Sequence, residues 1–139
     1  MAGPSLIPEL DVSDLGRSLD FYVNLIGFAV LYEREEERFV YLTLDDAHLM
    51  LEEAAGPGRR FHLAPLEVPY GRGVNFQITV ADAAALHERV LAAGFVPLMP
   101  LEERWYRRDD REIGLRQFAL ADPDGYLLRF ATRMRRPSL

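Results

Sequence analysis

The sequence contains neither cysteine nor lysine, and each absence removes a class of chemistry. Without cysteine, disulfide bonds and thiolate nucleophiles are excluded, and nothing points to an oxidising compartment. Because all 16 basic residues are arginine, no lysine is present to form a Schiff base with a carbonyl substrate. No serine lies in a turn typical of a catalytic nucleophile. Direct nucleophilic catalysis is therefore poorly supported.

Long hydrophobic runs and a basic charge balance are also lacking. No apolar run approaches the length that spans a bilayer, and the N-terminus lacks the basic-then-apolar order of a secretory signal. The formal net charge of −6 argues against nucleic-acid binding, which requires a basic face. The same charge would attract a cationic small molecule, or it could serve only to keep the protein soluble. We expect a cytoplasmic protein with no nucleic-acid or membrane partner.

What the sequence does contain is two similar halves. In each half an aspartate that can cap a helix is followed by an apolar helical pattern, over 14–25 and 82–93, and then by Gly-Phe. Each half also closes with an aspartate-containing turn between two strand-like runs, at 45–47 and 122–125. Such duplication predicts an α+β fold built from two tandem β-α-β-β-β modules.

The boundaries of the modules follow from a stretch rich in glycine and proline, which breaks regular structure. We expect a first module over 1–55, a linker over 56–73, a second module over 74–132 and a tail over 133–139. The expected strands are 6–12, 28–32, 39–44 and 48–52 in the first half, then 74–80, 101–107 and the two runs that flank 122–125, with a charged loop at 108–112.

Several motifs make the chain resemble the vicinal oxygen chelate superfamily, which includes glyoxalase I, extradiol dioxygenases and bleomycin-resistance proteins. The resemblance covers nearly the whole chain, and the bleomycin-resistance proteins are the closest branch. It implies that two curved mixed sheets enclose a cleft. The motifs are Ser-Leu-Asp-Phe-Tyr (18–22), Leu-Ile-Gly-Phe (25–28), His-Leu-Met-Leu-Glu (48–52), Gly-Val-Asn-Phe-Gln (73–77) and Arg-Gln-Phe-Ala-Leu-Ala-Asp-Pro-Asp-Gly (116–125).

Enzymes of this superfamily hold a divalent metal in the cleft, and the resemblance places Ile7, Glu52, Gly73 and Arg129 at the four ligand positions. Only Glu52 can ligate, whereas a catalytic site needs about three protein ligands. Arg129 would add a positive charge where the cation belongs. We therefore expect no metal and no cofactor. An unconventional pair of His48 with Glu52, which alternate onto one face of a strand, stays open as an alternative.

Strand alternation identifies the side chains that we expect to line the cleft and bind a ligand. This wall suits stacking and hydrogen bonding better than acid–base chemistry, although each aromatic singly could be an ordinary strand residue. Glu52 and Arg129 could instead form a salt bridge across the cleft. The expected lining residues are Phe39, Tyr41, His48, Glu52, Asn75, Gln77, Trp105, Gln117 and Arg129.

Three further expectations accompany this lining. Trp105 is expected to share its strand face with Leu101 and Glu103. Val74, Phe76 and Ile78 are expected to pack under the second helix. His62 and His87 are expected to be exposed to solvent.

Three functions compete. The first is a metal-free binding protein with no catalytic residues, which sequesters a bleomycin-type glycopeptide; the resemblance implies a homodimer with ligands in clefts at its interface. The second is a metal-dependent lyase, isomerase or transferase that uses Glu52 and His48. The third is a binding module for another small metabolite, an anionic one in view of four arginines beside Trp105 that would repel a cation. These arginines are Arg104, Arg107, Arg108 and Arg111.

Overall fold

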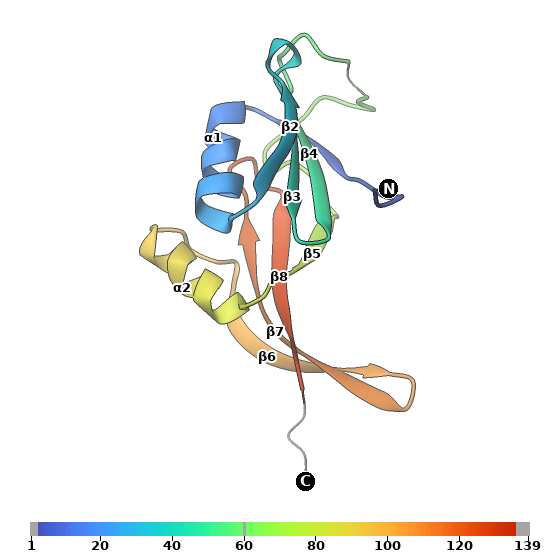
Figure 1. Ribbon diagram of the computed structural model, residues 1–139, viewed down its shortest axis with the longest axis vertical. Helices are drawn as coiled ribbons and strands as arrows, with labels where there is room; N and C mark the ends of the chain where they lie inside the picture. The colour runs from blue at the N-terminus through green and yellow to red at the C-terminus, as the bar shows by residue number, and fades with distance from the viewer. Residues whose placement is uncertain (1–2, 60, 136–139) are drawn as a thin grey trace. The chain divides into compact units, whose positions relative to one another are not determined.

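The computed structural model describes residues 3–59 and 61–135, and the chain divides into two compact units, Met1–Tyr70 and Gly71–Leu139. Each unit holds one β-α-β-β-β module with a four-stranded mixed sheet (Figure 1), which confirms the predicted α+β fold and its duplication. That the two sheets enclose a common cleft stays a prediction. No helix among the described residues is long and apolar enough to cross a membrane.

The first unit builds its sheet in the order β1-β4-β3-β2, with β1 parallel to β4 and the other pairs antiparallel. Its elements are β1 (Glu9–Val12), α1 (Leu15–Leu19), η1 (Asp20–Ile26), β2 (Ala29–Arg34), η2 (Glu35–Glu37), β3 (Phe39–Leu44) and β4 (Ala47–Glu53).

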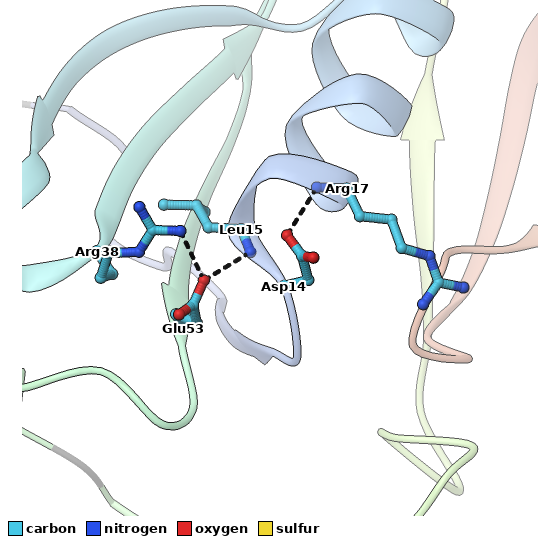
Figure 2. Close-up of polar contacts among 5 residues, drawn as sticks. All are labelled: Asp14, Leu15, Arg17, Arg38 and Glu53. Carbon is cyan, nitrogen blue, oxygen red and sulfur yellow. Dashed lines mark hydrogen bonds and ion pairs between the residues drawn. The ribbon is translucent and has the colours of Figure 1, made fainter.

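The first turn of helix α1 is fixed from two sides (Figure 2). The Asp14 side chain caps the helix by accepting a hydrogen bond of 3.1 Å from the Arg17 backbone N–H. Glu53, at the end of β4, accepts a hydrogen bond of 2.9 Å from the Leu15 backbone N–H. The same Glu53 oxygen lies 2.9 Å from the Arg38 guanidinium. The Arg38 hydrogen bond, followed by the Leu15 N–H, lowers the pKa of Glu53 below its usual value.

The predicted helix over 14–25 is present, but its winding changes at Asp20. From there to Ile26 the helix is π-helical, and it ends at Gly27, whose φ of 109° is left-handed. The Gly27 N–H donates to the carbonyl of Tyr22, five residues earlier, at 3.1 Å. Glycine suits this position because a positive φ costs it little.

The core of the first unit lies between helix α1 and one face of the sheet (Figure 1). Alternate strand residues point to this face, so that Leu10 and Val12 are buried while Glu9 is exposed. The buried apolar set is Leu10, Val12, Leu15, Phe21, Tyr22, Ile26, Phe28, Val40, Leu42, Leu49 and Leu51.

The second unit repeats the plan in the order β5-β8-β7-β6, with β5 parallel to β8. Asp82 caps its helix by accepting from the Ala85 N–H at 3.0 Å. The Thr132 hydroxyl accepts a hydrogen bond of 2.7 Å from the Ala83 N–H. It has the same role at this helix as Glu53 has toward the Leu15 N–H in the first unit. The elements are β5 (Asn75–Thr79), α2 (Ala83–Ala92), β6 (Met99–Arg108), β7 (Arg111–Ala121) and β8 (Leu127–Met134).

On the helix side of this sheet, Phe76 and Ile78 lie beside the buried Leu128 and Phe130, as expected, with Ile78 buried and Phe76 half-buried. The same expectation was wrong for Val74, which precedes β5 and is 50% exposed. The expected exposure of His87 was also wrong. His87 is half-buried rather than exposed: its ring contacts Phe118, with centroids 5.2 Å apart. Its Nε2 accepts from the Leu101 N–H at 3.3 Å.

The charged loop expected at 108–112 is wrong, because strand pairing continues through it. Arg108 pairs with Arg111, and only Asp109 and Asp110 form the turn, with Asp109 at a φ of 55°. Aspartate tolerates this left-handed conformation, and charged side chains stay solvated along an exposed hairpin. Strand β8 runs to Met134, and residues 136–139 of the expected tail lie outside the described residues.

The closing turn at 122–125 is confirmed. One Asp122 oxygen accepts from the Asp124 N–H at 2.9 Å and from the Tyr126 N–H at 2.8 Å. Gly125 has a φ of 95°, which glycine adopts without strain. The turn thereby fixes the register of β7 against β8, on which the inner face of the second sheet depends.

Candidate functional site

The inner face of the first sheet, opposite helix α1, carries acidic and aromatic side chains. Strand register places Asp11 beside Glu52, Glu52 beside Phe39, and Thr43 beside His48. The predicted common face for Phe39, Tyr41, His48 and Glu52 is therefore correct as a matter of strand geometry, while their contact with a ligand stays a prediction.

The aromatic part of this face is largely engaged within the protein. Phe39 and Tyr41 are only 2% and 7% exposed. The Tyr41 hydroxyl lies 2.6 Å from Nδ1 of His48. Tyr32 stacks on Tyr41 with centroids 5.1 Å apart, and the Arg34 guanidinium lies 4.0 Å above the Phe39 ring. Tyr32 is 45% exposed, so it is the aromatic ring of this face that a ligand can reach.

Sequence reasoning missed Tyr32 and Arg34 as members of this face. The strand β2 contains a bulge between Val30 and Tyr32, which shifts the alternation by one residue. The signal that was present is the run of aromatics in two neighbouring strands, since cross-strand aromatic pairs stabilise sheets.

The acidic part of the face comprises Glu9, Asp11 and Glu52. Burial raises the pKa of Glu9, and the nearby carboxylates of Glu52 and then Asp11 raise it further, against a lowering effect of Arg34. His62 is exposed, as expected, and its Nε2 lies 2.8 Å from an Asp11 oxygen.

Glu52 is 4% exposed because the chain at Gly58 covers its carboxylate. A Cβ atom on Gly58 would collide with the carboxylate end of Glu52, so a larger residue here would require that carboxylate to move.

The structure does not bring His48 and Glu52 together as a ligand pair. Four residues along β4 separate their backbones by roughly 13 Å. His48 is also held by its contact with Tyr41. Over residues 3–59 and 61–135, no three His, Asp or Glu side chains are grouped so that they could hold a metal ion.

The inner face of the second sheet, opposite helix α2, contains a cavity of about 590 Å³. The register brings Gln77 beside Arg129 and Asn75 beside Leu127 on this face. Its lining combines two arginines, three polar groups and an apolar floor. The lining residues are Gln77, Thr79, Tyr106, Ile113, Leu115, Arg129, Ala131 and Arg133.

A chain of hydrogen bonds centred on Gln117 runs along the cavity wall. Gln117 is 1% exposed, and its Oε1 accepts a hydrogen bond of 3.0 Å from Nη1 of Arg129. Its Nε2 donates to the Tyr106 hydroxyl at 2.6 Å and lies 3.2 Å from Oε1 of Glu102. This arrangement satisfies a buried amide completely and holds the Arg129 guanidinium in place.

Trp105 shares its strand face with Glu103, as predicted, but the prediction that this face lines the cleft was wrong. Trp105 pairs with Gly114, and a Cβ on Gly114 would come within 2.6 Å of the indole ring, so the ring lies on the sheet face opposite Gln117. A bulge between Met99 and Glu102 shifts the alternation of β6, and Tyr106 takes the inner face instead.

The nine predicted lining residues therefore fall into three sets. One set shares the inner face of the first sheet: Phe39, Tyr41, His48 and Glu52. A second set shares the inner face of the second sheet: Asn75, Gln77, Gln117 and Arg129. Trp105 lies on the outer face of the second sheet, and a salt bridge between Glu52 and Arg129 stays a prediction.

Comparison with known proteins agrees with this architecture. The sequence model of the Glyoxalase/Bleomycin resistance protein/Dioxygenase superfamily matches residues 8–130. Bleomycin resistance proteins of Geobacillus stearothermophilus and Staphylococcus aureus are each 28% identical to this chain over 131 residues, which cover 89% of this chain and 92% of theirs.

Two solved structures are similar to this chain. One is a glyoxalase/bleomycin resistance protein/dioxygenase superfamily member from Vibrio splendidus 12B01, which is 40% identical to this chain. The alignment covers 91% of this chain and 95% of the Vibrio chain, and the TM-score is 0.42. TioX from Micromonospora sp. ML1 is 22% identical with a TM-score of 0.72, covering 95% of this chain and 100% of its own, and shares the fold. Because the superfamily model spans nearly the whole of both modules, the chain belongs to the glyoxalase/bleomycin resistance protein/dioxygenase superfamily.

Proposed function

We propose that this protein binds and sequesters a bleomycin-type glycopeptide without catalysing a reaction. The observation that carries this proposal is the inner face of the first sheet, which Glu9, Asp11 and Glu52 on β1 and β4 share with the exposed Tyr32 on β2. The names of the bleomycin resistance proteins to which the chain is similar supply the ligand class.

The electrostatics of this face favour a cationic ligand. Burial raises the pKa of Glu9, and the carboxylates of Glu52 and then Asp11 raise it further, so a cation placed near Glu9 would favour its ionised form, as Arg34 already does. The net charge of −6 would also attract a cation from a distance. Tyr32 offers an exposed stacking surface on the same sheet face, and its ring is held against Tyr41.

Binding is favoured over catalysis by the residues at the superfamily's ligand positions. Ile7, Gly73 and Arg129 cannot ligate a metal, and Glu52 is covered by Gly58. A homodimer with ligands at its interface remains part of the proposal, on the strength of the resemblance alone.

The test is a calorimetric titration with metal-free bleomycin, on protein whose divalent metal content has been measured. We expect saturable binding at about one ligand per chain, weakened severalfold in Tyr32→Ala and Glu9→Gln. Glu36→Gln, in the short helix η2, is the matched control and should bind normally. Absence of binding would refute sequestration, and stoichiometric metal in the purified protein would favour the metal-dependent enzyme instead.

A further inference from the structure

The cavity of the second sheet has a chemistry that the first sheet lacks. Its walls carry the guanidinium groups of Arg129 and Arg133, and its floor is formed by Ile113, Leu115 and Ala131. This combination concerns residues 71–135 alone, so an inference from it does not rest on bleomycin binding.

The hydrogen bonds of Gln117 determine which groups of the cavity can donate. Arginine can only donate hydrogen bonds, so the amide atom that faces Arg129 must be the oxygen. The amide nitrogen therefore faces Glu102 and Tyr106, as a carboxylate acceptor at Glu102 requires. Because the Tyr106 hydroxyl accepts from this nitrogen, its own hydrogen is left to donate elsewhere.

The positive charge of the cavity is not cancelled within the protein. Arg129 uses one of its five N–H groups on the neutral Gln117. No carboxylate is paired with Arg129 or Arg133 among the residues that the structure describes; their nearest acidic neighbour in the network, Glu102, is directed at Gln117. A buried amide thus holds a guanidinium in a fixed orientation at the cavity wall without neutralising it.

We propose that this cavity binds an organic carboxylate with an apolar body. The carboxylate would pair with the remaining N–H groups of Arg129 and accept the hydrogen of the Tyr106 hydroxyl, which suits the planar fork geometry of arginine. The apolar body would cover Ile113, Leu115 and Ala131. Gln117 is a positioning residue, since it acts on the ligand only through Arg129 and Tyr106.

A pair of isosteric probes tests the charge requirement in the unaltered protein. 2-Naphthoate and the neutral 2-naphthamide differ only at the group that would face Arg129. In calorimetric titrations at low ionic strength, naphthoate should bind at least about tenfold more tightly than naphthamide. Equal affinities would overturn the proposal, whatever the variants do.

Variants then test which residues cause the preference. Arg129→Met should abolish the preference for naphthoate, and Gln117→Leu should reduce it severalfold while leaving the naphthamide affinity unchanged. Arg107→Gln, which removes a charge near the tip of the β6–β7 hairpin outside the cavity, is the matched control. If Arg129→Met folds by circular dichroism and keeps the preference, the proposal is wrong.

Arg133→Gln covers the case in which Arg129→Met does not fold, because Arg133 is exposed. It should weaken naphthoate binding about two- to threefold and leave naphthamide unaffected. An unchanged naphthoate affinity in Arg133→Gln would remove Arg133 from the site and count against the proposal.

Inorganic phosphate, matched in ionic strength by chloride, distinguishes a carboxylate from a phosphate ligand. We expect no displacement of naphthoate by phosphate, whereas displacement would assign the cavity to phosphate groups and overturn the carboxylate class. Failure here leaves bleomycin binding untouched, because that proposal is read from Tyr32 and Glu9 and this one from Arg129 and Gln117.

Discussion

The two halves of this protein share a topology but present opposite charges on their inner faces. In the first sheet the parallel pair β1–β4 places Asp11 beside Glu52. In the second sheet the equivalent pair β5–β8 places Gln77 beside Arg129. The fold therefore constrains the strand residues that face the helices to be apolar. The alternate residues, on the inner faces, can differ in charge between the two halves.

The halves also differ in the length of their strands. Strands β6 and β7 contain 10 and 11 residues, whereas β2 and β3 contain 6 each. Tyr106 and Ile113 belong to these longer strands, and both line the cavity. The longer β6–β7 hairpin therefore contributes to the wall of the cavity, while its charge comes from Arg129 and Arg133 of β8.

The first prediction tests whether the helix-facing sides are equivalent. Leu51 and Leu128 occupy matching positions, one residue before Glu52 and Arg129, and both are 0% exposed. Truncating either to alanine should lower the free energy of unfolding by about 2–5 kcal/mol, because each leaves a cavity under a helix. Urea denaturation followed by circular dichroism measures both. A cost below about 1 kcal/mol at one site only would show that the two cores are not equivalent.

The second prediction concerns the polar network that the first half lacks. Gln117→Leu should lower the free energy of unfolding by about 1–3 kcal/mol, because Glu102, Tyr106 and Arg129 all lose a partner. Glu103→Gln, which weakens an exposed ion pair with Arg116, is the control and should change stability by less than about 0.5 kcal/mol. Equal small effects would mean that solvent replaces Gln117.

The sequence alone predicts the features that depend on local hydrogen bonds, but not those that depend on the pairing of strands. The helix caps at Asp14 and Asp82 and the turn after Asp122 each use a local side-chain hydrogen bond, so the sequence alone locates them. Trp105 was assigned to the wrong sheet face, and Tyr32 was not identified as a lining residue. Each lies in a strand that contains a bulge, between Met99 and Glu102 in β6 and between Val30 and Tyr32 in β2, so alternation alone does not give the face of the whole strand. Bulges depend on pairing with a neighbouring strand, which no local pattern records.

The third prediction compares the two acceptors that hold the first backbone N–H of each helix. Thr132→Val should lower the free energy of unfolding by about 1 kcal/mol at every pH, because a neutral hydroxyl loses its bonds to Ala83 and Val80. Glu53→Gln should destabilise the protein at neutral pH only. The pKa of Glu53 is lowered in the folded state, so its contribution is complete above the pKa of the unfolded chain and disappears as pH falls through the folded pKa.

Urea denaturation of both variants between neutral and acidic pH provides the measurement. The difference between Glu53→Gln and the unaltered protein should shrink as the pH falls through the acidic range, while the difference for Thr132→Val stays constant. A constant difference for Glu53→Gln would mean that its bonds to Leu15 and Arg38 do not depend on the charge.

The fourth prediction concerns Glu9 on the acidic inner face of the first sheet, where we expect the smallest change in stability. The pKa of Glu9 is raised in the folded state by burial and by Glu52, so protonated Glu9 favours folding below the unfolded pKa, and this advantage is lost as pH rises through the folded pKa. Glu9→Gln should therefore stabilise the protein by a few tenths of a kcal/mol at neutral pH and have no effect in acid. Asn75→Gln, at the matching position of β5, should change stability at neither pH, because no carboxylate lies beside it in the register of β5 with β8. If Glu9→Gln instead lowers stability at neutral pH, Arg34 rather than the two carboxylates dominates the environment of Glu9. The two inner faces would then differ in shape and not in charge.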